Sequence, residues 1–185
     1  MIVYGLILIV ILQRLIEVII AKKNEQWMKK QGGYEVGKSH YRYMVMLHML
    51  FFCSLLLEVS LTPPQFYMWS LIPLSLFLVA QICRGWALSS LGRFWNTRII
   101  VLPGAKVKVK GPYRFIRHPN YLVVVIEIMM LPLLFQAYVT MILFTILNGW
   151  ILSVRIREEE QALRGVTNYE NAFSNKKRFL PIIDD

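Results

Sequence analysis

Five long apolar segments constrain the fold of this chain more than any other feature of its sequence. They cover residues 2–20, 43–61, 66–83, 121–135 and 138–154. A helix that crosses a bilayer needs about 20 mostly apolar residues, and about 17 are enough for a short one. Segment 121–135 is shorter, so we expect its helix to extend back toward His118 and Pro119 or to lie partly outside the hydrocarbon. The sequence therefore predicts an all-α integral membrane protein with about five transmembrane helices.

The basic residues predict how this protein is oriented. Of the 21 Lys and Arg residues, six lie in 22–42, eight in 84–117 and six in 155–178, and the remaining one is Arg14. Because cytoplasmic loops carry an excess of Lys and Arg, we expect the N-terminus outside and both large loops and the C-terminus in the cytoplasm. The net charge of +10 then indicates contact with anionic membrane lipids. No aromatic-basic motif points to nucleic acid.

The chain reads as a single membrane domain, 1–185, because no linker or internal repeat interrupts the apolar segments. Residues 1–90 hold the N-terminal helices, and residues 91–185 are the expected cofactor-binding and catalytic region. The apolar N-terminus lacks the basic region and the cleavage site of a signal peptide, so we expect a retained helix. Beyond residue 154, apolar residues recur at helical spacing among charged ones, which predicts a cytoplasmic amphipathic C-terminal helix. These residues are Ala162, Leu163, Val166, Tyr169 and Phe173.

Two polar clusters flank the last two apolar segments. The first is the stretch 91–121, LGRFWNTRIIVLPGAKVKVKGPYRFIRHPNY, and the second is 155–160, RIREEE. Taken alone, the first could hold basic residues that grip lipid phosphates, and the second could hold carboxylates that pair with nearby arginines. Pro63 and Pro64 mark a tight break between segments 43–61 and 66–83, which predicts one helical hairpin. The turn at 136–137 is so short that segments 121–135 and 138–154 must form another. We therefore expect both clusters to meet at one membrane face.

At these residues the chain resembles the isoprenylcysteine carboxyl methyltransferase family. The resemblance rests on GPYRFIRHPNY, on LGRFW upstream, on Tyr169 and Pro181, and on R-I-x-x-E-E-x-x-L, read as Arg155, Ile156, Glu159, Glu160 and Leu163. It covers about half of the chain, from Leu91 to Pro181. The stretches QRLIEVIIAKKNEQWMKKQGG and SHYRYMVMLH look closest to a bacterial branch that is associated with type III polyketide synthases and methylates alkylpyrones.

The resemblance implies a site for S-adenosylmethionine in the last two helices and their flanks. The cofactor-binding residues would be Tyr113, His118, Pro119, Tyr121, Arg155, Glu159 and Glu160. Glu159, Glu160 or both would meet the ammonium group of the cofactor, and the sequence does not decide among the three adjacent glutamates, which include Glu158. Arg117 would hold the anionic oxygen of the acceptor. Val123 and Phe173 differ from a common glycine and a common tyrosine of the family, so we expect a pocket of altered shape.

Ionisable residues inside the apolar segments form a second group of candidates. Glu127 lies two turns into its helix, where a charge is costly and often functional, so we expect it to line the acceptor pocket or to hold helices together. Glu58 lies near the outer end of its helix, where water can solvate it. Arg14 and Glu17 are three residues apart and should pair. The sequence does not cluster His40, His48, Cys53 and Cys83 as metal ligands, so we expect no metal site.

The leading prediction is a membrane O-methyltransferase for an acidic oxygen of a lipophilic small molecule. Methyl transfer from a sulfonium is an in-line displacement, so the protein must chiefly align donor and acceptor in a dry site. An ionised enol or carboxylate needs no strong base, and an alkyl tail could enter from the bilayer. Two alternatives remain open: an NADPH-dependent reductase of a lipid double bond, which rests on RHPNY alone, and a non-enzymatic lipid-binding protein.

Overall fold

The computed structural model describes residues 2–180, apart from the side chain of His40, and is almost entirely helical. Its elements in chain order are α1 (Ile2–Lys30), β1 (Tyr34–Val36), α2 (Lys38–Leu61), the 3₁₀ helix η1 (Met68–Ser70), α3 (Leu71–Leu91), η2 (Gly92–Phe94), β2 (Ile99–Val101), η3 (Gly111–Arg114), α4 (Pro119–Leu134), α5 (Tyr138–Arg164) and α6 (Tyr169–Phe173). The predicted all-α membrane protein is confirmed. Pro181, one of the residues of the family resemblance, lies outside the described residues.

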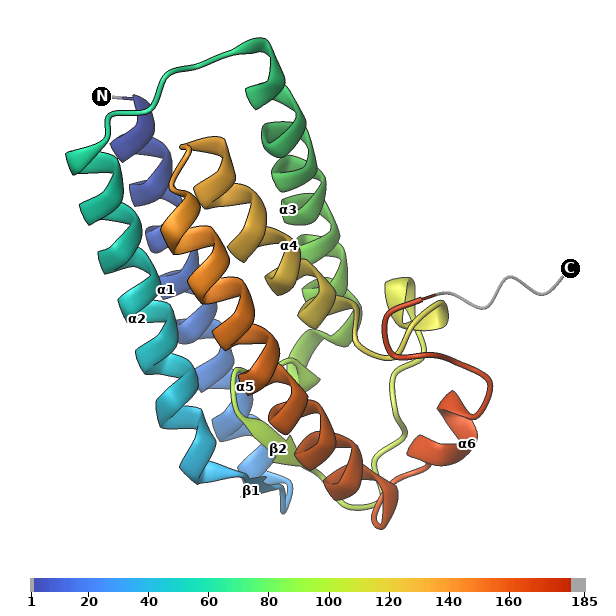
Figure 1. Cartoon of the computed structure of the whole chain (residues 1–185). Coiled ribbons are helices and arrows are strands. Elements are labelled where there is room, and N and C mark those ends of the chain that lie inside the picture. The colour runs from blue at the N-terminus through green and yellow to red at the C-terminus, as the bar shows by residue number, and fades with distance from the viewer. Residues whose placement is uncertain (1, 181–185) are drawn as a thin grey trace, which may run out of the picture.

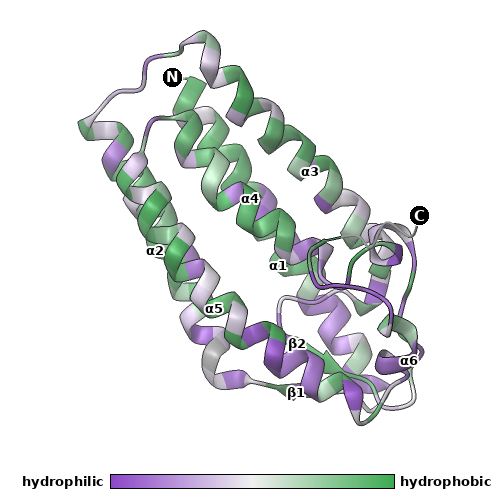
Figure 2. Cartoon of the chain, turned by 45° about the vertical axis from the view of Figure 1, so that its right-hand side comes forward, coloured by the Kyte–Doolittle hydropathy of each residue, from purple (hydrophilic) through white to green (hydrophobic). Residues whose placement is uncertain are grey.

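Five long helices form an elongated bundle with an apolar surface. Within residues 2–180, α1, α2, α3 and α5 are long and apolar enough to cross a membrane, and α4 is a shorter apolar helix. Figure 2 shows that hydrophobic residues cover most of the bundle, whereas hydrophilic residues gather at the end that carries β1, β2 and α6. We call this end the loop end. Lipid can therefore solvate the sides of the bundle, and water the loop end.

The order of packing differs from the expected pair of hairpins. The hairpin of α4 and α5 is present, and α3 packs on α4 while α2 packs on α5. Helices α2 and α3 lie on opposite sides of the bundle in Figure 1, joined by a segment that crosses its end. The predicted hairpin of these two helices is therefore wrong, because the segment containing Pro63 and Pro64 is extended and long enough to separate them.

Two helix ends also differ from the predicted boundaries. Helix α1 continues past residue 20 to Lys30, because the polar residues that follow the apolar segment are good helix formers, and it ends before Gly32 and Gly33. Helix α3 continues past residue 83 to Leu91 and ends at Gly92, whose φ of 56° suits glycine. Apolarity marks where a helix lies in lipid, but it does not mark where the helix stops.

The expected C-terminal amphipathic helix is replaced by two shorter pieces. Helix α5 runs on to Arg164 and so includes the first part of the predicted helix, whereas α6 has only five residues. The break lies at 165–168, where the Thr167 hydroxyl donates to the Leu163 carbonyl at 2.7 Å. The side chain of Asn168 accepts from the backbone N–H of Val107 at 2.8 Å. The bond of Thr167 is local and competes with helix continuation, whereas the bond of Asn168 connects the break to the loop between β2 and η3.

Two features at the ends of the bundle position the helices. Strands β1 and β2 pair antiparallel at the loop end and join the two large loops, an element that the sequence pattern did not predict. At the other end, the Glu58 carboxylate accepts hydrogen bonds from the backbone N–H groups of Val139 at 3.0 Å and Thr140 at 2.8 Å. Glu58 is partly exposed near the outer end of α2, as expected, and in addition it caps the first turn of α5.

Candidate active site

A single cavity of about 500 Å³ runs from the loop end into the membrane-spanning part of the bundle. Near the loop end it is lined by polar side chains, which we call the polar chamber: Tyr113, Arg117, His118, Tyr121, Glu159 and Tyr169. Deeper in the bundle it is lined by apolar side chains, which we call the apolar arm: Val10, Phe51, Phe77 and Leu131. The cavity can therefore hold a polar molecule and a lipophilic one in contact with each other.

The chamber forms where the two predicted motifs meet. Tyr121, at the start of α4, donates its hydroxyl hydrogen to the Glu159 carboxylate of α5. The Arg155 Nε atom donates to the Tyr121 hydroxyl oxygen at 2.8 Å, and a terminal nitrogen of Arg155 donates to the Thr97 carbonyl at 2.6 Å. Arg155 is buried, so these contacts fix it in place. The expected convergence of the two clusters at one end of the hairpin is confirmed.

A second group of contacts connects the chamber to the C-terminal segment. The Nε2 atom of buried His118 lies 3.0 Å from a Glu160 carboxylate oxygen. The Arg178 guanidinium donates to both Glu160 oxygens, at 3.0 and 2.7 Å. The backbone N–H of His118 donates to the Arg178 carbonyl at 3.1 Å, and that of Arg117 donates to the Lys177 carbonyl at 3.1 Å. Residues 174–180, which we call the strap, are thereby held against the start of α4.

The glutamates predicted to share the cofactor face in different directions. Glu159 lines the cavity, whereas Glu160 does not. Glu160 is 2% exposed, and its carboxylate is bound by His118 and Arg178. Glu158 does not line the cavity either. Among the three adjacent carboxylates, Glu159 therefore has direct access to a bound molecule.

The local sequence around α4 explains how the chamber residues are presented. Pro119 is the first residue of α4, where a missing N–H costs nothing, and it is buried without lining the cavity. The helix therefore begins directly after His118, and His118 and Tyr121 both lie at its N-terminal end. Their rings stack there, with the ring centroids 5.3 Å apart. The side chain of Arg117 lines the cavity while its Nε atom donates to the Lys176 carbonyl.

Two tyrosines of the chamber are held as neutral hydroxyl groups. Burial raises the pKa of Tyr113, and the charge of Glu159 raises it further. Burial also raises the pKa of Tyr169, to which the charges of Glu160 and Glu159 add. Both phenols therefore remain protonated around neutral pH and can donate a hydrogen bond to an anionic or carbonyl oxygen.

The sequence analysis missed three residues that line the cavity and carry an unpaired buried polar atom. The Nε1 atom of Trp95 and the Oδ1 atoms of Asn96 and Asn120 have no hydrogen-bond partner within the described part of the chain. All three residues line the cavity. Buried polar atoms are normally paired, so these atoms are suited to the polar groups of a bound molecule. Trp95 and Asn120 lie inside the LGRFW and RHPNY motifs, which was the available signal.

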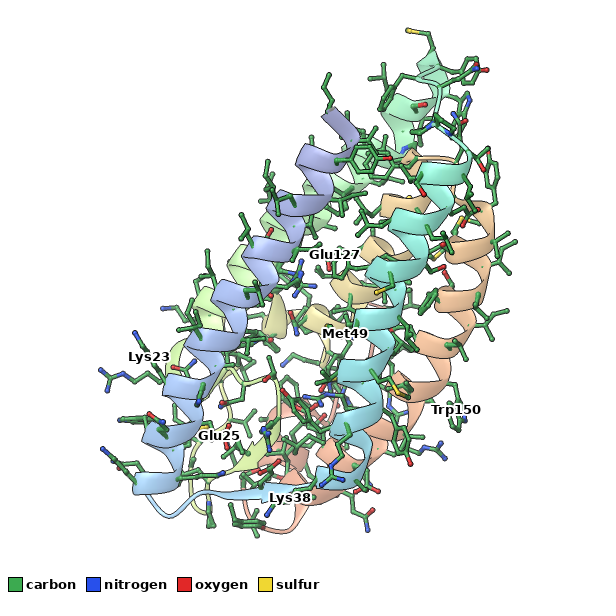
Figure 3. The ribbon with its side chains drawn as sticks, turned by 90° about the vertical axis from the view of Figure 1, so that its left-hand side faces the viewer. Lys23, Glu25, Lys38, Met49, Glu127 and Trp150 are labelled. Atoms are coloured by element: carbon green, nitrogen blue, oxygen red, sulfur yellow. The ribbon has the colours of Figure 1, made fainter. Side chains whose placement is uncertain are left out.

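Glu127 lines the same cavity about two turns deeper than Tyr121. Figure 3 shows Glu127 inside the bundle, whereas Trp150 points away from it. The Arg84 guanidinium binds both Glu127 oxygens, and Arg14 donates to one of them at 2.9 Å. The predicted pair of Arg14 with Glu17 is confirmed at 2.6 Å. Glu127 thus connects α1, α3 and α4 and also faces the cavity, which are the two roles considered for it.

Across residues 2–180, no three His, Cys, Asp or Glu side chains lie close enough together to hold a metal ion. The polar chamber offers several kinds of hydrogen-bonding group to a bound molecule. Its polar side chains comprise phenols, an imidazole, a carboxylate and unpaired amide and indole groups. This donor and acceptor set fits a molecule with an ammonium group, hydroxyl groups and an aromatic base.

The fold and the cavity define a helical membrane protein that can hold a polar molecule beside a lipophilic one. The chain belongs to the isoprenylcysteine carboxyl methyltransferase family, whose sequence profile matches residues 71–165. Members of this family are membrane methyltransferases that use S-adenosylmethionine. The matched residues include α3, α4 and α5 and therefore most of the polar chamber.

Two bacterial proteins are similar over most of the chain. The uncharacterized protein YpbQ of Bacillus subtilis is 53% identical over 159 residues, which cover 86% of this chain and 95% of that protein. An uncharacterized protein of Haemophilus influenzae is 26% identical over 145 residues, which cover 78% of this chain and 84% of that protein. No solved structure matches the chain.

Proposed function

We propose that this protein is an S-adenosylmethionine-dependent O-methyltransferase for an acidic oxygen of a lipophilic small molecule. The acceptor oxygen belongs to an enol, as in an alkylpyrone, or to a carboxylate like that of a prenylcysteine. One observation carries the proposal beyond family membership: the polar chamber built by the family motifs continues without a break into an apolar arm inside the membrane. We expect the donor to enter this cavity from water at the loop end and the acceptor to enter it from lipid.

The cofactor belongs in the polar chamber, with its ammonium group at Glu159. The hydroxyls of Tyr113 and Tyr169 and the unpaired atoms of Trp95, Asn96 and Asn120 are available to its other polar groups. When bound, S-adenosylmethionine supplies an electrophilic methyl group. Tyr121 and Arg155 position Glu159, and His118 with Glu160 hold the strap against the start of α4. Of the predicted cofactor residues, Pro119 and Glu160 support the site without facing the cavity.

Arg117 serves the acceptor. One of its N–H groups is engaged by the Lys176 carbonyl, and the guanidinium carries further donors that can meet an anionic oxygen in the cavity. A cation beside this oxygen orients it for in-line attack, whereas it would repel the positive charge of the cofactor. The aliphatic or prenyl part of the acceptor lies in the apolar arm, where burial of each methylene contributes about 0.8 kcal/mol.

The test is methyl transfer by the purified protein in detergent. With radiolabelled S-adenosylmethionine, we expect protein-dependent label in a long-chain alkylpyrone or in farnesylcysteine. A parallel reaction with NADPH and an unsaturated sterol tests the alternative reductase. Label in an extracted acceptor supports the proposal. Oxidation of NADPH without methyl transfer, or neither reaction despite a bound lipophile, would favour one of the other two functions.

A further inference from the structure

The cavity contains a second polar region at the middle of the membrane helices, separate from the polar chamber. Each of the five long helices contributes at least one polar side chain to its lining there: Arg14 and Glu17 of α1, His48 of α2, Arg84 of α3, Glu127 of α4 and Asn148 of α5. Polar side chains at this depth are costly, and they mark functional positions more often than polar residues in water do.

Four of these side chains satisfy one another, and Glu17 accepts hydrogen bonds from Arg14 at 2.6 Å and from Arg84 at 3.2 Å. Arg84 binds both oxygens of Glu127, and Arg14 donates to one of them at 2.9 Å. Gln81 donates to the same carboxylate at 2.9 Å. The ion cluster therefore has its charges compensated and needs no ligand, and it provides a polar wall at this depth.

His48 presents a free acceptor atom to the cavity. Its Nδ1 atom lies 2.8 Å from the Met44 carbonyl oxygen, one turn earlier in α2. A carbonyl oxygen can only accept a hydrogen bond, so Nδ1 carries the proton, and in the neutral ring Nε2 is left as an acceptor. Among the described residues, no donor reaches Nε2.

Asn148 lies level with His48 on the facing helix. Helices α2 and α5 run antiparallel, since Ser54 contacts Thr140 at 2.8 Å and the ring of Phe51 lies 5.6 Å from that of Phe144.

From the first of these contacts to the second, the chain moves three residues back in α2 and four residues forward in α5. Repeating this step places His48 opposite Asn148. Asn148 is 2% exposed and lines the cavity, and no hydrogen bond to its amide is formed within residues 2–180. An amide buried in this way is suited to a polar group of a ligand.

We propose that His48 and Asn148 form a subsite for a hydroxyl group of the lipophilic acceptor. The Nε2 atom of His48 accepts the hydroxyl hydrogen, and the amide of Asn148 donates to the hydroxyl oxygen. The apolar arm, with Phe51, Phe77 and Leu131, takes the chain of the ligand beyond this point. The inference rests on the proposed function, because it takes the ligand to be the methyl acceptor. It selects acceptors that carry a neutral hydroxyl group on a long apolar chain, in addition to the anionic oxygen that is methylated beside Arg117.

The test compares a hydroxyl donor with its methylated counterpart. Tetradecanol and tetradecyl methyl ether are titrated into the purified full-length protein in detergent, and the ratio of their affinities is compared between variants, so that partition into detergent cancels. We expect the wild type to bind the alcohol about tenfold more tightly than the ether, because the ether has no hydrogen to donate to the buried acceptor atom. His48→Leu and Asn148→Leu should each bring the ratio to within about twofold.

Thr145→Val is the matched control. Thr145 lies on α5 one turn from Asn148, and its hydroxyl is buried without a partner in the described chain but does not line the cavity. Its substitution should leave the ratio unchanged. If the wild type shows no preference, or if a folded His48→Leu variant keeps the full preference, the subsite is wrong.

Binding of S-adenosylhomocysteine separates this inference from the proposed function. Variants that bind it as the wild type does are folded, and if His48→Leu does not fold, Asn148→Leu decides the matter. A wild type that binds S-adenosylhomocysteine but does not prefer the alcohol refutes the subsite alone. A wild type that prefers the alcohol but does not bind S-adenosylhomocysteine supports the subsite and refutes the methyltransferase.

Discussion

At the scale of single residues, Arg117 makes the sharpest prediction about catalysis. Arg117→Ala should lower kcat/KM for the methyl acceptor by ~10²-fold, equivalent to ~3 kcal/mol of lost transition-state alignment. The affinity for S-adenosylhomocysteine should stay within a few-fold, because the proposal places Arg117 against the acceptor oxygen and not against the cofactor. Arg117→Lys should restore activity in part, since a point charge lacks the planar fork of donors. Enzyme kinetics and calorimetry give the two values.

Arg114→Ala is the control for general loss of charge in the same segment. Arg114 is exposed and ends η3, so its replacement should change neither value. If Arg117→Ala lost the cofactor but kept acceptor turnover at saturating cofactor, the role given to Arg117 would be reversed.

Gly111 makes a prediction about stability. Its φ is 58°, and a Cβ atom there would lie 2.9 Å from the Cβ of Ser90 on α3. Gly104 has a φ of 73° with open space around it, so Gly104→Ala reports the backbone strain without the clash. Gly111→Ala should therefore be less stable than Gly104→Ala by ~1–3 kcal/mol, measured by unfolding in sodium dodecyl sulfate. Equal losses of stability would contradict the close packing of η3 on α3.

At the scale of elements, the strap depends on Glu160. Glu160→Gln removes the charge that His118 and Arg178 share, and charged hydrogen bonds contribute about 1.5–3 kcal/mol. The strap should open more often, so trypsin should cut at 176–178 about tenfold faster. Glu170→Gln is the control, because this carboxylate is 69% exposed and comes no closer than 3.8 Å to the Arg164 guanidinium. Unchanged cleavage of Glu160→Gln would contradict the anchoring role of Glu160.

The element scale also shows what the sequence could predict. Apolar length predicted all five long helices, since only a helix or a closed barrel satisfies backbone groups in lipid. It missed the helix ends at Lys30 and Leu91, because residues that leave the membrane can remain helical. It missed the capping role of Glu58, which depends on how α2 and α5 pack. Packing between distant segments is not encoded in local periodicity.

The site was predictable to a similar degree. The short turn between α4 and α5 brought Tyr121 and Glu159 together as expected, because the hairpin leaves no other arrangement. The division of roles between Glu159 and Glu160 was not predictable, because it depends on which face of α5 meets Arg178 of the strap. Nor was the mid-membrane position of His48 opposite Asn148, since it requires the register of two helices.

At the scale of the whole molecule, orientation in the membrane is a direct test of the charge pattern. In a background with Cys53 and Cys83 replaced by serine, Lys110→Cys at the loop end should react with a membrane-impermeant maleimide only after the cells are opened. Thr62→Cys, at the other end of the bundle, should react in intact cells. Labelling of Lys110→Cys from outside would overturn the predicted topology.

Binding of the cofactor product tests the central claim most directly. Calorimetric titration with S-adenosylhomocysteine should show one site in the wild type, and NADP should give no signal. Glu159→Gln should weaken that binding by ~1–3 kcal/mol, because Glu159 faces the cavity, where it meets the ammonium group. Glu158→Gln removes the neighbouring charge outside the cavity and should bind as the wild type does. Equal losses in both variants, or binding of NADP in place of S-adenosylhomocysteine, would contradict this account.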